Sequence, residues 1–206
     1  MGDSVEQRLL RDVSWREDEL AILRALYSME SETTPRGRAL RRSYLAMLYA
    51  HYEGFCKQAW EECQIEISRC GRPLSQIRCE IASQFLADEI SNLRNESTDK
   101  FVDGILGFRL RLMDTVSPPY KKHETSNLWP SVLSDVLEKL NLSTLEVRAH
   151  QVALKSLVAR RNDIAHGENV GVSDADLQTM HNAVWDVILA LIIDVVKYFE
   201  DRRYLK

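Results

Sequence analysis

The sequence contains little glycine and little proline, with 8 Gly and 5 Pro in 206 residues. Collagen-like chains, mucin-like stalks and long disordered linkers are therefore excluded, because each needs a much larger share of these residues. The hydrophobic content of 45% and the net charge of only −4 also exclude an intrinsically disordered chain. We expect a single globular domain that spans residues 1–206.

Signals for export, membrane insertion and metal binding are also missing. The N-terminus has no basic segment followed by an apolar one. The most apolar run, residues 187–196, is far shorter than the roughly 20 residues of a membrane span, and we expect it to form a buried core helix. No Cys-x-x-Cys pair occurs, and the histidines do not follow metal-ligand spacing. We therefore expect a cytoplasmic protein without a membrane partner, a metal or a cofactor.

Apolar residues recur every three or four positions along most of the chain, which predicts helices and not strands. Turn-forming segments that contain Gly or Pro separate the helical stretches. We expect helices over residues 5–29, 39–69, 74–93 and 101–116. The longest polar connection should follow at residues 117–128.

Three further helices are expected in the C-terminal half. A short one should begin near Pro130, capped by Ser126 or Asn127. Capping-box patterns at Ser143 and Ser173 open the other two, which should end at residue 166, with residue 167 as a left-handed cap, and near residue 203. The predicted fold class is an all-α helical bundle of about five to seven helices.

One segment, residues 157–168, concentrates polar side chains at the end of a predicted helix. It carries Arg160, Arg161, Asn162 and His166 in the last two turns. Arg161 and His166 are five residues apart, about 140° around a helix, while Asn162 and His166 share one face. Such residues also occur as ordinary caps, because cations complement the negative end of the helix dipole. The segment alone therefore leaves a structural and a functional interpretation open.

Several stretches together resemble a known family. Residues 161–167 (RNDIAHG) are similar to the Arg-x4-6-His motif of the HEPN superfamily, in the form where Asn follows Arg. Residues 48–57 (LYAHYEGFCK), 127–133 (NLWPSVL) and 203–206 (RYLK) resemble the branch called RiboL-PSP-HEPN. The matches run in the family's order from about residue 40 to the end, and residues 1–35 and 95–120 are not covered.

The resemblance implies a helical bundle that forms a homodimer and, in active members, a metal-independent endoribonuclease. Arg161 and His166 carry over as the catalytic pair, and Asn162 as the residue that orients them. Some HEPN domains are inactive binding modules, but here the motif is intact. The resemblance also makes a toxin or antiviral effector plausible, with RNA as substrate and a cognate antitoxin or regulatory protein as a possible partner.

General chemistry is consistent with this assignment. RNA cleavage by its own 2′-hydroxyl needs a group that moves a proton near neutral pH, and histidine has a suitable unperturbed pKa. The negative charge that develops on the phosphorane oxygens needs a fixed cation, which arginine supplies. Whether His166 acts as acid, base or electrostatic support stays open. A two-fold dimer would bring two Arg161–His166 sets to one groove.

Other residues are weaker candidates. Glu53 and Lys57 are one helical turn apart and form either a surface ion pair or part of the cleft, which Arg160 would extend. Four arginines crowd the start of the second predicted helix and are candidates for RNA-backbone contact, although a solvated basic face is the simpler interpretation. They are Arg36, Arg38, Arg41 and Arg42. Two rival functions remain: a non-catalytic HEPN-like module that binds RNA, nucleotide or protein, and a helical scaffold.

Overall fold

The computed structural model describes residues 3–114 and 127–206, which contain eight α-helices, one 3-10 helix and no β-strand. The helices are α1 (Val5–Ser28), α2 (Pro35–Arg69), η1 (Leu74–Gln76), α3 (Cys79–Arg94), α4 (Thr98–Asp114), α5 (Pro130–Leu140), α6 (Leu145–Ala149), α7 (Gln151–Ala165) and α8 (Asp174–Glu200). The all-α prediction is confirmed. The polar connection predicted at residues 117–128 lies almost wholly outside the described residues.

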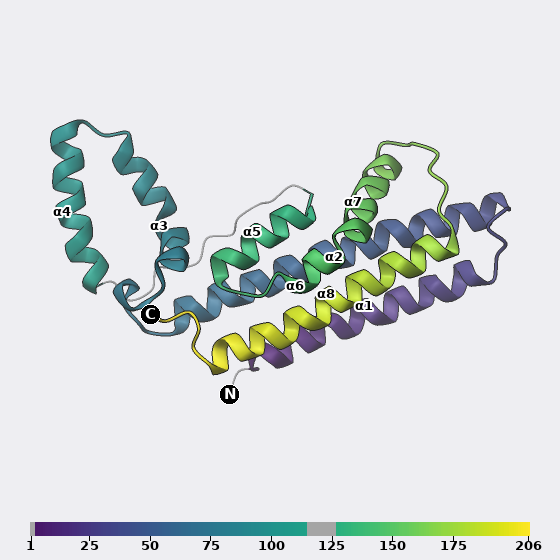
Figure 1. The fold of residues 1–206 in the computed structure, drawn as a ribbon, viewed down its shortest axis with the longest axis horizontal. Coiled ribbons are helices and arrows are strands. Elements are labelled where there is room, and N and C mark those ends of the chain that lie inside the picture. The colour runs from purple at the N-terminus through teal and green to yellow at the C-terminus, as the bar shows by residue number, and fades with distance from the viewer. Residues whose placement is uncertain (1–2, 115–126) are drawn as a thin grey trace.

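The three longest helices, α1, α2 and α8, lie side by side and form the body of the molecule (Figure 1). Among the described residues, α8 alone is long and apolar enough to span a membrane by length and composition. However, ten of its residues, including Leu177, Val184 and Val195, are buried in the hydrophobic core. Within residues 187–196 the predicted core helix is confirmed for one face, because Leu189 and Ile193 on the other face are exposed.

The start of α2 differs from the prediction for a local reason. The hydroxyl of Thr34 accepts a hydrogen bond from the backbone N–H of Gly37 at 2.9 Å, and Pro35 occupies the first helical turn. The helix therefore begins at residue 35, four residues earlier than expected. Glycine is required at position 37, because a Cβ atom there would lie 2.0 Å from the carbonyl oxygen of Ser31.

The helix expected over residues 143–166 is two helices. The helix is interrupted at His150, whose φ of −99° and ψ of 14° separate α6 from α7. Thr144 is the N-cap of α6, so the capping box predicted at Ser143 is not formed. Because of this break, the described residues hold eight α-helices, which is more than the predicted five to seven, and α7 rises steeply from the body (Figure 1).

The remaining segments are the pair α3 and α4, the C-terminal tail and α5. Helices α3 and α4 form an arm at one end (Figure 1). The C-terminal tail pairs with the chain after η1, where Arg78 N–H donates to the Tyr204 carbonyl at 3.0 Å. Helix α5 begins at Pro130 as predicted, but its N-cap is Trp129 and not Asn127, while Ser126, the other predicted cap, lies outside the described residues.

Candidate active site at the end of helix α7

Helix α7 ends in a turn that presents His166. Gly167 has a φ of 85°, and its N–H donates to the Ile164 carbonyl at 3.1 Å. The N–H of Glu168 donates to the Asp163 carbonyl at 2.9 Å, which completes a Schellman motif. The predicted left-handed cap at Gly167 is confirmed. His166 itself is the C-cap residue, and its side chain is exposed.

Arg161 points from α7 toward α2. Its Cζ atom lies 4.3 Å from the centre of the Tyr49 ring, a cation–π contact. Its Nη1 atom donates to Asn127 Oδ1 at 2.8 Å and to Asn162 Oδ1 at 2.9 Å. The half-buried guanidinium is therefore held from three sides by uncharged groups.

The charge of Arg161 has no counterion among the described residues, because no carboxylate there lies within ion-pair distance. Two other buried or half-buried arginines are neutralised by a carboxylate, whereas half-buried Arg24 and Arg42 have neutral described partners, Gln178 and Asn169. Arg16 pairs with Asp12 at 2.8 Å, and Arg203 pairs with Asp194 at 2.6 Å. Arg161 is thus positioned without being neutralised, and its charge stays available to an anion.

Tyr49 connects this arginine to the segment before α5. Its hydroxyl accepts a hydrogen bond from the backbone N–H of Leu128 at 2.9 Å, and both residues are buried. Burial raises the pKa of Tyr49, and the nearby carboxylate of Glu53 adds to this effect. The hydroxyl is neutral at physiological pH and fixes the segment that carries Asn127.

A face of α2 extends the site in both directions from Tyr49. Toward the C-terminus, Glu53 and Lys57 form an ion pair at 3.0 Å. Toward the N-terminus, an open cleft of about 450 Å³ lies between α2 and the connection from α7 to α8, with Arg42 and Asn169 among its lining residues. These α2 positions share one side of the helix by its period.

The three stretches that resemble the HEPN superfamily within residues 48–57, 127–133 and 161–167 therefore meet around one guanidinium. The whole sequence was compared with known families, and residues 5–204 match the MAE_28990-like HEPN family. The chain belongs to the HEPN superfamily. The match does not confirm the RiboL-PSP-HEPN branch, and it includes α1, which the resemblance had left out. Comparisons with curated proteins and with solved structures gave no match.

Two residues of this HEPN site, Tyr49 and Asn127, were missed as functional residues by sequence reasoning. Both stand inside stretches that carry the family resemblance, which was the available signal. Tyr49 received no role beyond its place in the resembling stretch, and Asn127 was assigned to a helix cap. Their contact with Arg161 depends on tertiary packing between α2, α7 and the segment before α5.

One of the four arginines predicted to contact RNA is not accessible in the HEPN domain. Arg41 is buried, and its Nε and Nη2 atoms donate to the carboxylate of Asp174 at 2.7 and 3.0 Å. This pairing raises the pKa of Arg41 and lowers that of Asp174. The prediction for Arg41 is therefore wrong: this arginine attaches the start of α8 to α2.

The other predicted cations are distributed around the site. Arg160 donates to Asp176 at 2.8 Å and to the Gly171 carbonyl at 3.3 Å, so it fixes the connection between α7 and α8. Arg38 donates to the Thr33 carbonyl at 2.5 Å and lines the cleft. The side chain of Arg36 is 77% exposed and lies 3.2 Å from Glu30, outside the cleft lining.

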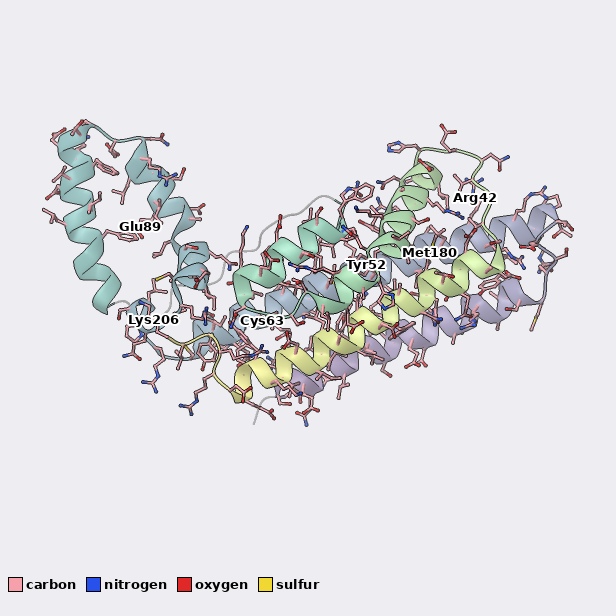
Figure 2. The ribbon with its side chains drawn as sticks, viewed as in Figure 1. Arg42, Tyr52, Cys63, Glu89, Met180 and Lys206 are labelled. Atoms are coloured by element: carbon pink, nitrogen blue, oxygen red, sulfur yellow. The ribbon has the colours of Figure 1, made fainter. Side chains whose placement is uncertain are left out.

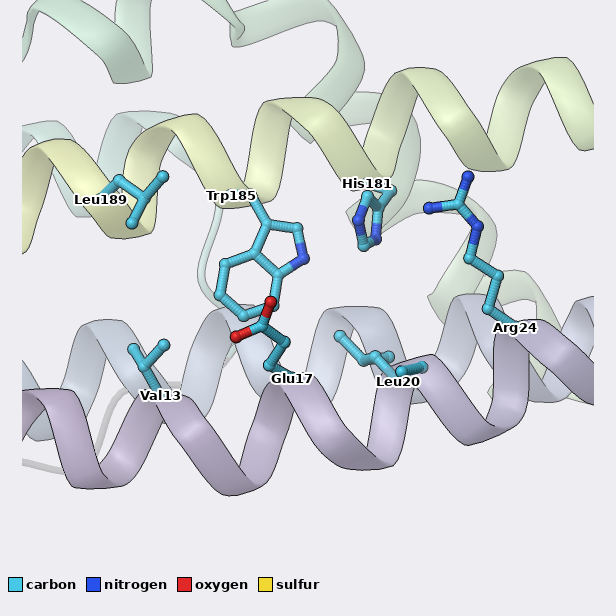
Figure 3. Close-up of a pocket in the computed structure, with 8 residues that line it drawn as sticks. Val13, Glu17, Leu20, Arg24, His181, Trp185 and Leu189 are labelled. Atoms are coloured by element: carbon cyan, nitrogen blue, oxygen red, sulfur yellow. The ribbon is translucent and has the colours of Figure 1, made fainter.

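Two further histidines lie in the body of the HEPN domain. His51 is buried, with Nε2 at 2.8 Å from Glu19, and burial lowers its pKa. His181 lines a groove of about 360 Å³ between α1 and α8, where it lies near Trp185 and Arg24 (Figure 3). Burial lowers the pKa of His181 to about 4, and its Nδ1 atom lies 2.7 Å from the Tyr44 hydroxyl. Neither ring has a described contact with Arg161 or with its partners Tyr49, Asn127 and Asn162.

Proposed function

We propose that this HEPN domain is a metal-independent endoribonuclease in which Arg161 and His166 act on the scissile phosphodiester and Asn162 orients Arg161. The observation that supports this most directly is the state of Arg161, which is held by Tyr49 and Asn127 yet has no carboxylate partner among the described residues. A fixed cation of this kind stabilises the negative charge that develops on a phosphorane.

The net reaction consumes no water or other co-reactant, because the nucleophile is the 2′-hydroxyl of the RNA. The 2′-oxygen forms a bond to phosphorus as its proton passes to a base, and the bond to the 5′-oxygen breaks as that oxygen receives a proton. The products are a 2′,3′-cyclic phosphate and a 5′-hydroxyl. His166 is exposed, carries an imidazole suited to either proton transfer, and stands at the end of the helix that carries Arg161.

A homodimer accounts for the separation of the two groups. Arg161 and His166 are about 140° apart around α7, so the imidazole does not share the face that packs on α2. The outer face of α7, which leads to His166, also carries Val152, which is 84% exposed, and the exposed Ala159. Pairing of these faces across a two-fold axis would bring the two copies of His166 to one interface and place both Arg161–His166 sets along one groove.

The cellular role that we propose is that of a cytoplasmic toxin or antiviral effector, restrained by a cognate antitoxin or regulatory protein. A nuclease without a metal requirement has no cofactor through which its activity is limited. Restraint must then act on the site or on the dimer, and the exposed end of α7 is accessible to such a partner.

The direct test is incubation of purified protein with mixed RNA in EDTA, beside Arg161→Ala and His166→Ala. The expected result is cleavage by the parent alone, with cyclic-phosphate ends. Arg148→Ala is a matched control, because this exposed arginine pairs with Glu138 at 2.8 Å and is outside the site. RNA retention without cleavage would instead support a non-catalytic binding module.

Mixing the two inactive variants tests the dimer. If the site combines Arg161 of one chain with His166 of the other, about half of randomly mixed dimers hold one intact site of two, and roughly a quarter of the parental rate returns. No recovery after subunit exchange would place both groups in one chain and contradict the composite site.

A further inference from the structure

The cleft beside the His166 turn has the size and chemistry of a ligand site. Its volume of about 450 Å³ lies within the range of about 300–1,000 Å³ that is typical of small-molecule sites. One side is α2, with Ala39, Arg42 and Ala46, and the other is the end of α7 and the connection that follows it, with Ile164 and Asn169. His166 lies between these last two residues in the chain, so the cleft adjoins the turn that carries His166.

The charge in the cleft is positive, although the whole chain has a net charge of −4. Arg38 and Arg42 line it, and its lining contains no acidic residue. Their described hydrogen-bond partners are neutral: Arg38 donates to the Thr33 carbonyl, and Arg42 donates to Asn169 Oδ1 at 3.4 Å. Asp163, in the last turn of α7, and Glu168, in the connection, are not among the lining residues of the cleft. An anionic ligand is therefore favoured.

The apolar part of the lining, here called the apolar floor, consists of Ala39 and Ala46 on α2 and Ile164 on α7. No aromatic ring is among the described lining residues. A nucleotide combines the two features that such a cleft selects, a phosphate for the guanidiniums and a planar base for the apolar floor. A base inside a duplex is stacked and paired, so it cannot enter.

The position along α2 relates the cleft to the proposed catalytic centre. Arg42 and Tyr49 are seven residues apart, about 10 Å along the helix axis, and nearly on one line of its surface. Figure 2 places Arg42 beside the connection between α7 and α8. One RNA strand laid along this face reaches the Arg42 end and Arg161 without bending around the molecule.

We infer that the cleft lined by Arg38, Arg42, Ala39, Ala46, Ile164 and Asn169 is a subsite for an unpaired nucleotide that flanks the scissile phosphate, with its phosphate on the two arginines and its base on the apolar floor. This inference rests on the proposed function, because it takes RNA as the ligand. It adds the location of the neighbouring nucleotide and the demand that this nucleotide be unpaired.

Binding measurements test the subsite separately from catalysis. The probe is a short end-labelled single-stranded RNA, and the protein carries His166→Ala so that no cleavage occurs. Arg42→Ala should weaken binding about tenfold and lower the slope of log affinity against log salt by about one, whereas Arg42→Lys should keep the slope. Ala39→Trp, at an exposed helix position, should weaken binding about tenfold by filling the cleft, without changing the slope.

Two variants serve as controls. Arg69→Ala removes an exposed arginine from the far end of α2, and Ala87→Trp adds the same indole to an exposed position of α3. Both should bind RNA as the parent does. Equal binding by Arg42→Ala, Ala39→Trp and the parent, or equal affinity for single-stranded and duplex RNA, would overturn the subsite. Cleft-dependent binding, together with no RNA cleavage by the unmutated chain, would support nucleotide binding in the cleft and remove the ribonuclease proposal instead.

Discussion

Replacing Tyr49 separates the two tasks that its side chain performs. Tyr49→Phe keeps the ring under Arg161 but removes the hydroxyl, which leaves the buried N–H of Leu128 without its acceptor. An unsatisfied buried N–H costs about 1–3 kcal/mol in the free energy of unfolding. For a domain of this size we expect the midpoint of thermal unfolding to fall by roughly 3–8 °C. The rate constant kcat should change only a few-fold, because Arg161 keeps its aromatic support.

Tyr49→Leu removes the ring as well. A cation–π contact at a partly desolvated site contributes about 1–2 kcal/mol, and here it also fixes the direction of the guanidinium. We expect kcat for RNA cleavage in EDTA to fall by about 5–30-fold relative to Tyr49→Phe, since roughly 1.4 kcal/mol corresponds to a factor of ten. The value of KM should change less, because the cleft around Arg42 is intact.

Tyr52→Phe is the matched control. Tyr52 is buried three residues further along α2, and its hydroxyl has no hydrogen-bond partner within the described part of the chain. Its removal should change neither stability nor kcat. The reasoning about Arg161 would be refuted by a folded Tyr49→Leu protein with the parental kcat, or by an equal loss of kcat in Tyr52→Phe.

Three other predictions concern stability. Arg41→Ala should lower the free energy of unfolding by about 2–3 kcal/mol in a chemical denaturation experiment, because it removes hydrogen bonds to the Asp174 carboxylate and the Glu30 backbone carbonyl. Arg42→Ala should change it by less than about 0.5 kcal/mol. Equal effects of the two substitutions would contradict the assigned roles. Gly37→Ala should cost at least about 2 kcal/mol by the same measurement, because the new methyl group meets the Ser31 carbonyl, and an unchanged midpoint would argue against a helix start at residue 35. Acidification should destabilise the fold, because the unfolded chain protonates His181 near its ordinary pKa of 6.5 and the folded chain only at about 4. The contribution of neutral His181 to the free energy of unfolding is fully present above pH 6.5 and is lost as the pH falls toward 4. At pH 5 the loss is about 1 kcal/mol after allowance for the partial exposure of the ring. The lowered pKa of His51 acts in the same direction. Thermal scans at pH 7.5 and 5 should show a smaller difference for His181→Gln than for the parent, and equal differences would exclude His181 as a source.

The helical class, most helix positions and the polar end of α7 were predictable from sequence, because they depend on local periodicity and caps. The break at His150 was not, since nothing in residues 143–166 interrupts the apolar pattern. The placement of Arg41 was also missed. Its neighbours in sequence are exposed or half-buried arginines, and only the arrival of Asp174 from 133 residues away makes its burial favourable.

The candidate site divides in the same way. Arg161, Asn162 and His166 come from one short stretch, and the family resemblance together with their spacing selects them. Tyr49 and Asn127 act on Arg161 across chain separations that periodicity does not encode, and the structure was needed to find them. The structure was also needed to separate Arg38 and Arg42 from Arg36 and Arg41, since all four stand at the start of one predicted helix. Only Arg38 and Arg42 line the cleft that forms where α2 packs near the connection between α7 and α8.

The uninterrupted length of α2 limits how this surface can change. A single residue inserted between positions 42 and 53 would rotate everything beyond it by about 100° and carry the Glu53 end away from α7. Deletions have the same effect in the opposite sense. Related chains can therefore vary this surface by exchanging side chains at fixed positions, whereas changes of length are confined to the connections between helices, where they leave the alignment of the groups along α2 intact.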